Sequence, residues 1–190
     1  QPFKYGDLKI LAEMFSEDDY FVRLDLTSGF HHINIHPMHT KYLGFKWTFS
    51  DATTRYFLFT VLAFGLKSAC YVFTKVLRPL NTRWRGKGIK SLCYIDDGIG
   101  GRSTKQSAFE AGVQIKQDLT RAGFVINWEK SEFEPKQKGK WLGTNIDTTT
   151  MSFTIPSEKI AMVKRTLVAI LAQPTTRPKQ IADIACLVSS

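Results

Sequence analysis

Three aspartates lie where charge is unexpected in this sequence. Asp25 ends an apolar run that reads as a strand, and Asp96 and Asp97 lie between two short apolar runs. Several like charges placed near one another in a partly buried site are unfavourable unless a cation or a hydrogen-bond donor offsets them. Converging carboxylates at strand ends therefore indicate a divalent-metal site. Mg²⁺ is the expected ion, because it prefers oxygen ligands and keeps positions open for phosphate.

Each aspartate also has an ordinary interpretation. Asp97 and Gly98 form an Asp-Gly pair, which favours a hairpin turn, and a strand-end aspartate such as Asp25 often serves as a cap or an ion-pair partner. Adjacent residues on extended backbone point to opposite faces of a sheet. Asp96 and Asp97 are therefore not expected to face one metal ion equally unless the turn twists them together.

The charge of the chain is strongly positive and unevenly distributed. In its 190 residues, 26 Lys and Arg oppose 17 Asp and Glu, a net charge of +9. No acidic residue lies between Asp51 and Asp96, where eight basic residues occur. Such a field suits a phosphate backbone or an anionic membrane surface, and the alternative is a solvated basic face without a specific partner. No apolar run approaches the roughly 20 residues that cross a bilayer.

Three other groups of residues do not indicate a metal, disulfide or dinucleotide-binding site. Cys70, Cys93 and Cys186 form no CxxC pair, which argues against a disulfide framework or a zinc ribbon and for a reducing compartment, cytoplasmic or nuclear. The histidines at 31, 32, 36 and 39 are separated by strand alternation and Pro37, with no cysteine nearby to complete a zinc site. The glycine-rich segment 98–101 lacks the context of a dinucleotide fingerprint.

The elements that must position the aspartates alternate between helix and strand. Helices are expected at Gly6–Phe15, Ala69–Trp84, Thr104–Ala122, Pro156–Ala172 and from Pro178 onward. Strands are expected at Tyr20–Leu26, Ile33–Ile35, Leu43–Phe49, Tyr56–Leu62, Ser91–Ile95, Ile99–Gly101, Phe124–Ile126, Lys140–Ile146 and Met151–Ile155. This order favours an α+β fold, with a sheet covered by helices on one side.

Five segments, in this order, resemble motifs of the reverse transcriptases. Leu24–Ile33 is similar to the first catalytic motif, in which an Asp is followed five positions later by an aromatic residue. The segment Leu62–Ala69, with Phe73, is similar to the one beneath template and nucleotide, and Tyr94–Asp97 is similar to the second catalytic motif. Two further motifs are matched by Gly123–Asn127 with Lys130 and by Trp141–Gly143, the primer-grip hairpin.

The five motifs together cover about residues 20–147. The finer pattern looks most like retrotransposon polymerases of tyrosine-recombinase-encoding elements, with gypsy-type elements as the alternative. Ala63 and Cys70 depart from it, since such elements commonly carry proline there, and loss of two fixed φ angles is expected to loosen that loop.

The resemblance implies a polymerase palm, an antiparallel sheet with helices packed on one face. Residues 1–150 are expected to form this palm with partial fingers, and residues 151–190 the start of a thumb. Gln1 reads as a cut inside a longer polypeptide. The remaining fingers and thumb, and a ribonuclease H segment if there is one, are expected elsewhere in a parent polyprotein.

The resemblance also implies roles for individual residues. Asp25 and Asp96 would hold two Mg²⁺ ions, with Mn²⁺ as a possible substitute, assisted by the Leu26 carbonyl and more peripherally by Asp97. Lys130 would serve as a proton donor near the leaving pyrophosphate, and its alternative is a solvated lysine.

Nucleotide and nucleic acid would be bound by residues around these carboxylates. The nucleotide-binding set is Thr27, Ser28, Gly29, Phe30, Phe64, Gly65 and Lys130. The nucleic-acid-binding set is Lys67, Lys75, Arg78, Tyr94, Trp141, Leu142 and Gly143. Phe30 occupies the position of an aromatic gate against the sugar 2′-hydroxyl, which predicts a preference for deoxynucleotides, and its alternative is a plain core residue.

The expected function is that of an RNA-directed DNA polymerase, transferring a nucleotide from a dNTP to a primer 3′-hydroxyl on an RNA or DNA template. No membrane partner is expected. One alternative is a nucleic-acid-binding module that has lost polymerisation, motivated by Ala63, Cys70 and the missing parts. Another is an RNA-templated RNA polymerase, which Phe30 disfavours. As an isolated piece the palm is not expected to be fully active.

Overall fold

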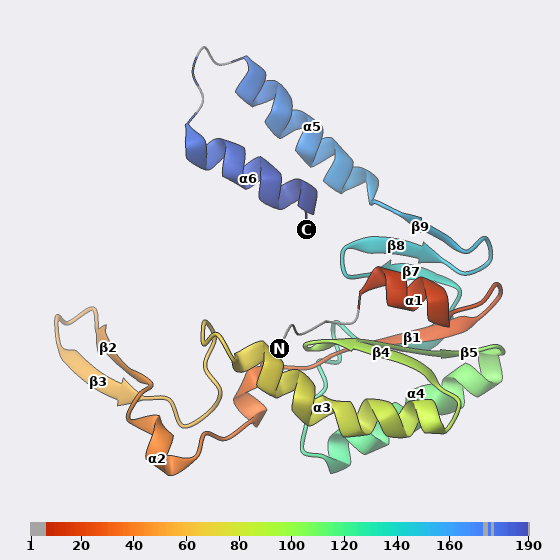
Figure 1. Ribbon diagram of the computed structural model, residues 1–190, viewed down its shortest axis with the longest axis horizontal. Coiled ribbons are helices and arrows are strands. Elements are labelled where there is room, and N and C mark those ends of the chain that lie inside the picture. The colour runs from red at the N-terminus through yellow and green to blue at the C-terminus, as the bar shows by residue number, and fades with distance from the viewer. Residues whose placement is uncertain (1–6, 173–174, 176, 190) are drawn as a thin grey trace.

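The computed structural model describes residues 7–172, 175 and 177–189, and its centre is a four-stranded antiparallel sheet (Figure 1). The strand order is β4 (Lys90–Tyr94), β5 (Asp97–Arg102), β1 (Tyr20–Asp25) and β6 (Glu132–Lys136). Strand β5 pairs with β1 along its whole length, from Tyr20 opposite Arg102 to Asp25 opposite Asp97. The two strands that carry the expected catalytic aspartates are therefore neighbours in the sheet.

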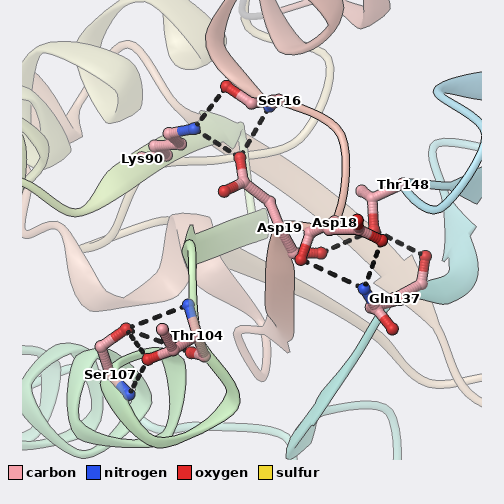
Figure 2. A network of polar contacts seen from close by, with 8 residues as sticks. All are labelled: Ser16, Asp18, Asp19, Lys90, Thr104, Ser107, Gln137 and Thr148. Atoms are coloured by element: carbon pink, nitrogen blue, oxygen red, sulfur yellow. Dashed lines mark hydrogen bonds and ion pairs between the residues drawn. The ribbon is translucent and has the colours of Figure 1, made fainter.

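Helices α3 (Ala69–Gly86) and α4 (Lys105–Arg121) cover one face of this sheet. Helix α3 buries Ala69, Phe73, Leu77 and Trp84, whose spacing places them on one side of a helix. They pack in one core with Leu24 of β1 and Ile115 of α4. Helix α4 begins with a capping box, in which Thr104 and Ser107 satisfy each other's backbone N–H groups (Figure 2).

The opposite face is covered by α1 (Leu8–Met14) and a second sheet of β7 (Lys138–Trp141), β8 (Thr144–Asp147) and β9 (Ser152–Thr154). A second core lies here and contains Leu11, Phe21, Leu92, Ile99, Trp141 and Ile146. Since side chains alternate along a strand, Asp25 lies on the same face as Phe21 and Arg23, toward this second sheet. The α+β palm predicted from the sequence, with helices packed on one face of an antiparallel sheet, is confirmed.

The remaining elements extend from this body at two places. The first group contains η1 (Gly29–His32), α2 (Pro37–Thr40), β2 (Gly44–Thr48) and β3 (Thr54–Leu58). The hairpin β2–β3 exposes every one of its residues, aromatic ones included. The second group contains α5 (Ser157–Leu171) and α6 (Pro178–Ser189), which pack against each other (Figure 1).

The turn between β4 and β5 was predicted one or two residues too late. It is formed by Ile95 and Asp96, and Asp97 and Gly98 already belong to β5. The glycine serves close packing rather than the turn, because a Cβ at position 98 would lie 2.8 Å from Leu24 Cγ. The turn itself is made by Ile95, which has a φ of 54°.

Other predicted elements also differ from the structure. Ile33–Ile35 and Phe124–Ile126 form only isolated bridges, through Asn34 and Ile126, rather than strands. The predicted strand Lys140–Ile146 is a hairpin, β7–β8, that turns at Leu142 and Gly143. The start of the first predicted helix, Gly6, lies outside the described residues, as does the end of the last.

Strand β6 was not predicted at all. Its sequence, Glu-Phe-Glu-Pro-Lys, is charged and contains Pro135, which argues against a central strand. The strand lies at the edge of the sheet, where a proline without an N–H group is tolerated.

Within the described part of the chain, no helix is both long and apolar enough to cross a membrane.

Candidate functional site

The three aspartates converge at one end of the sheet. Asp25 and Asp97 face each other across β1 and β5, and Asp96 lies in the adjoining turn. The Leu26 N–H donates a hydrogen bond to the Asp96 carbonyl over 3.2 Å, which joins the end of β1 to this turn. Because the N–H and C=O of one strand residue point to the same side, the Leu26 carbonyl is directed toward the same turn.

A buried glycine lets the next segment close over the turn. A Cβ at Gly29 would lie 2.9 Å from the Phe73 ring and 3.3 Å from the Asp96 Cβ atom. Ser28, just before it, has a φ of 51°, and Thr27 and Ser28 are exposed. Thr27 and Ser28 therefore form an exposed rim beside the carboxylates, with Gly29 buried beneath it.

The carboxylates perturb one another. Burial raises the pKa of Asp96, and the nearby Asp25 carboxylate raises it further. Burial also raises the pKa of Asp97, and the charges of Asp96 and Asp25 add to that effect. Lys130 opposes both increases, and Arg23 opposes the one on Asp97. Burial is thus the main reason why both carboxyl groups resist ionisation, and the neighbouring carboxylates add to it.

The donor chemistry of this site fits divalent cations. Half-buried carboxylates whose pKa is raised by burial and by a neighbouring carboxylate are stabilised in their charged form when a cation lies beside them, and Mg²⁺ prefers such oxygen ligands. Among the residues that the structure describes, no three or more His, Cys, Asp or Glu side chains form a group that could hold a metal ion. A cation at these carboxylates would therefore need further oxygen ligands, such as those of a backbone carbonyl, water or a substrate.

The raised pKa of Asp96 leads to a prediction about stability without metal. The free energy of unfolding of the native protein should rise as the pH falls through the raised pKa, because the folded state then gains a proton that removes the cost of burying the charge and relieves its repulsion with Asp25. Asp96→Asn removes the charge and should increase stability at pH 7 by at most about 1 kcal/mol, since water screens this half-buried group.

Urea unfolding from pH 7 to pH 4 in EDTA measures this effect. The difference in the free energy of unfolding between Asp96→Asn and the wild type should become smaller as the pH approaches 3.8, the ordinary pKa of an aspartate carboxyl group. A constant difference across this range would contradict the assignment. Asp51→Asn provides the matched control, since hydrogen bonds from Thr53 lower the pKa of this exposed aspartate.

Two polar residues to which the sequence analysis gave no role at the site, Ser131 and His32, hold it in place. The Ser131 hydroxyl accepts a hydrogen bond from the Asp25 N–H over 3.0 Å. His32 Nε2 accepts one from the Val125 N–H over 3.1 Å, and its Nδ1 lies 3.2 Å from the Gly29 carbonyl. Both contacts span about a hundred residues of sequence, and no local pattern indicates them.

Lys130 is positioned by the segment that follows Val125. The Asn127 N–H donates to the Asp25 carbonyl over 2.9 Å, and the Asn127 side chain accepts a weaker bond of 3.4 Å from the Lys130 N–H. The Lys130 side chain is exposed and acts electrostatically on Asp96 and Asp97. The structure thus brings the lysine and the carboxylates into one electrostatic group.

The aromatic residues assigned to nucleotide binding form a connected group. Phe30 is 8% exposed and packs edge-on against Phe73, with ring centroids 5.3 Å apart. Phe64 packs edge-on against Phe30 at 5.0 Å and remains 66% exposed. Gly65, with a φ of 82°, has open space around its Cα. Phe30 is therefore both a core residue and the support of an exposed ring.

The basic residues assigned to nucleic acid lie on or before α3. Lys67 precedes the helix, and Lys75 and Arg78 lie three residues apart on its exposed side. The Lys75 ammonium group lies 5.5 Å from the centre of the Tyr71 ring. All three cations are accessible to a phosphate backbone.

The hairpin β7–β8 differs in one respect from its predicted role. Trp141 is 2% exposed and belongs to the second core, so its ring does not face solvent. The accessible part is the turn, where Leu142 and Gly143 have φ values of 46° and 72°. Tyr94 is half-buried against the same core. Trp141 therefore anchors the hairpin, and its turn is the part available to a ligand.

Comparisons with known proteins agree with this geometry. The profile of one family, described as reverse transcriptase (RNA-dependent DNA polymerase), matches residues 7–146. A Retrovirus-related Pol polyprotein from transposon opus of Drosophila melanogaster is 33% identical over 116 residues, which is 60% of this chain. The chain covers only 11% of that relative's length.

Solved structures of similar fold come from foamy virus. The protease-reverse transcriptase in complex with dsDNA matches 100% of this chain and 36% of its own, with a TM-score of 0.75 and 20% identity. The same kind of protein in complex with an RNA/DNA hybrid matches 97% of this chain and 23% of its own, with a TM-score of 0.71 and 20% identity. At this identity the likeness shows the fold.

Proposed function

The chain belongs to the reverse transcriptase family, and we propose that it is the catalytic palm of a retroelement RNA-directed DNA polymerase. The observation that supports this most is the placement of Asp25, Asp96 and Asp97 at one end of the sheet, where burial, and after it the Asp25 charge, raises the pKa of both Asp96 and Asp97. In this proposal residues 1–150 form the palm with partial fingers, and residues 151–190 begin the thumb. Primer extension on RNA and DNA templates, in the polypeptide that contains this chain, tests the proposal.

The proposed metal site uses the oxygen atoms described above. Asp25 and Asp96 would hold two Mg²⁺ or Mn²⁺ ions, with the Leu26 carbonyl as a further ligand and Asp97 in a peripheral place. When bound, the two ions would lower the pKa of the primer 3′-hydroxyl and neutralise charge on the triphosphate. The raised pKa values of Asp96 and Asp97 support this assignment, because burial and neighbouring carboxylates disfavour their charged forms and a bound cation would offset that cost.

The chain's own residues would orient the reactants. The exposed rim of Thr27 and Ser28 would receive the triphosphate beside the carboxylates, close to the backbone of Gly29. Lys130 would hold a proton at its Nζ atom for the leaving pyrophosphate. Its charge already acts on Asp96 and Asp97, which supports a position near the reacting groups.

The Phe30 and Phe64 pair would select the sugar and support the nascent base pair. Phe30 is fixed between Phe73 and Phe64, so its ring has little freedom to move away from a ribose 2′-hydroxyl. Phe64 and the uncrowded Gly65 would lie next to the base. An RNA-templated RNA polymerase must accept the ribose 2′-hydroxyl, so a ring that excludes this group disfavours that function.

Phe30→Val is expected to reduce the preference for deoxynucleotides over ribonucleotides by about 10²-fold, as removal of a steric barrier worth about 3 kcal/mol would do. The measurement is the ratio of kcat/KM for dNTP and rNTP. Phe30→Tyr keeps the ring and should keep the selection. An unchanged ratio in Phe30→Val would leave Phe30 as a core residue alone.

Nucleic acid would lie along α3 and the β7–β8 turn. Lys67, Lys75 and Arg78 would contact phosphates. Leu142 and Gly143 would contact the primer end. Trp141 and Tyr94, which pack in the second core, would support this turn. Contacts of this kind give affinity without sequence preference.

Removing cations from α3 tests this surface. Lys75→Ala combined with Arg78→Ala should reduce the slope of log Kd against log salt by about 1.5–2 for a duplex, because two phosphate contacts are lost. Fluorescence anisotropy with duplexes of different sequence measures this slope. The exposed Lys46→Ala on β2 serves as a comparison. A slope unchanged by the double replacement would place the nucleic acid elsewhere.

The second candidate function is a nucleic-acid-binding module without polymerisation, motivated by Ala63 and Cys70. Salt-sensitive duplex binding by the wild-type polypeptide, without any primer extension in Mg²⁺ or Mn²⁺, would favour it. We place the protein in a reducing compartment, cytoplasm or nucleus, which is supported by the free thiols of Cys70 and Cys93.

A further inference from the structure

A network of polar contacts joins the catalytic sheet to the second sheet at the end opposite the carboxylates (Figure 2). We call it the inter-sheet clamp, and it consists of Ser16, Asp18, Asp19, Lys90, Gln137 and Thr148. Asp19 immediately precedes β1, and Lys90 begins β4. Gln137 precedes β7, and Thr148 follows β8. The clamp therefore touches the starts of two strands that lead to the catalytic aspartates and both ends of one hairpin.

Thr148 is the centre of the clamp. It is 1% exposed, and its hydroxyl lies 2.6 Å from the Asp19 carbonyl and 3.1 Å from the Gln137 carbonyl. Its backbone N–H donates to the Gln137 carbonyl over 2.9 Å, and its carbonyl accepts from the Asp18 N–H over 2.9 Å. One buried residue is thus bonded to both sheets.

Asp19 fixes the catalytic side of the clamp. Its side chain is almost fully buried, and it pairs with the Lys90 ammonium group and accepts a hydrogen bond of 2.7 Å from the Ser16 N–H. A buried carboxylate with these partners leaves little freedom for the backbone around it. On the other side, the Gln137 amide donates to the Asp18 carbonyl over 3.1 Å.

We propose that Thr148 is a positioning residue that sets the angle between the β7–β8 hairpin and the catalytic strands. This inference rests on the proposed function, in which the Leu142–Gly143 turn contacts the primer end. The turn begins at Leu142, five residues along the chain from Gln137 of the clamp, or about 16 Å at the usual rise of a strand. A tilt of about 4° at the clamp would displace the turn by about 1 Å, and such a misplacement costs about 100-fold in rate.

The other contacts between the two sheets do not replace this control. Phe21 packs against the backbone at Gly139, where a Cβ would lie 3.1 Å from its ring, and Trp141 packs in the second core. These apolar contacts hold the two sheets together, whereas the hydrogen bonds of the clamp are directional and add a preferred angle between the sheets. The Arg23 guanidinium donates one hydrogen bond to the Lys140 carbonyl, at a single point along β7.

The experiment compares Thr148→Val with Thr148→Ser in the polypeptide that contains this chain. Valine keeps the shape and loses the hydroxyl, and serine keeps the hydroxyl. We expect Thr148→Val to lower kcat for nucleotide incorporation by about 30–100-fold while the Kd for primer–template changes by less than about threefold. Thr148→Ser should restore kcat to within about threefold of wild type, and Thr150→Val, an exposed hydroxyl in the same turn, should change neither value.

Hydrogen exchange of the β7–β8 amides gives a readout that does not need activity. Thr148→Val should speed this exchange at least about tenfold and leave β5 unchanged, because only the hairpin is released. If Thr148→Val fails to fold, Gln137→Ala removes a partly exposed amide from the same clamp and should lower kcat by about tenfold.

The outcomes separate the two proposals. A normal kcat in a folded Thr148→Val, or hairpin exchange equal to wild type, overturns the positioning role while polymerisation stands. Equal losses in the valine and serine variants also overturn it, since the hydroxyl would then not be the cause. A wild type without primer extension overturns the proposed function, and the positioning role with it.

Discussion

Asp96→Asn is expected to lower kcat/KM for nucleotide incorporation by at least about 10³-fold, equivalent to about 4 kcal/mol of transition-state stabilisation. The reason is geometric as well as electrostatic. Asp96 lies in the turn at which the Leu26 backbone and the Asp25 carboxylate converge, so its charge has no substitute at the same place. Asparagine keeps the shape and its own carbonyl contact, and removes only the charge.

Single-turnover primer extension in Mg²⁺ measures this loss. Asp51→Asn is the matched control, because Asp51 is an exposed aspartate whose contacts are confined to Thr53. Mg²⁺ or Mn²⁺ should also raise the Tm of the wild type and have a smaller effect on Asp96→Asn, a readout that does not depend on activity. Activity within tenfold of wild type would remove Asp96 from the catalytic machinery.

Gly101→Ala is expected to destabilise the fold by about 3 kcal/mol, or about 6–12 °C in Tm. A Cβ at this position would lie 2.6 Å from the Tyr20 carbonyl oxygen and 2.6 Å from the Phe15 ring. The carbonyl belongs to the neighbouring strand and cannot move without disturbing the pairing of β1 with β5. The same strands carry Asp25 and Asp97 at their other end, so the damage should reach the site.

Gly100→Ala is the matched comparison. At that position the contact, 2.4 Å, is with the terminal methyl of Ile115, which can change its rotamer. We expect a loss of about 1 kcal/mol there. Urea denaturation of both variants measures the difference, and equal losses would show that the close backbone approach at Gly101 is not what limits this strand.

The parts of this fold that were predictable from the sequence depend on local signals. Helix α4 was placed almost to the residue, because Thr104 caps its start and Gly123 follows its end. The end of β1 was predicted to within one residue, at Leu26 instead of Asp25. For the site, the motif order brought together aspartates that lie about 70 residues apart.

The parts that were missed depend on long-range pairing. β6 has a polar sequence with Pro135, and it is a strand because it pairs with the edge of β1 that β5 leaves open. The hairpin turn moved from Asp97-Gly98 to Ile95 and Asp96, because Gly98 is needed to accommodate Leu24. Trp141 was assigned to nucleic acid, yet it fills the core beneath the hairpin, and only neighbours distant in sequence reveal this.

The strand order also determines how long β1 has unpaired edges while the chain is being synthesised. β1 is an inner strand, and both its neighbours, β5 and β6, come later in the chain, with Phe21 opposite Gly101 and Lys136. At about 5–20 residues per second, the ribosome needs about 6–23 s to produce the 115 residues between positions 21 and 136. Both edges of β1 stay open until β5 is made, 80 residues after Phe21, and the edge that β6 covers stays open for the whole interval. An open strand edge of this kind favours aggregation and chaperone binding.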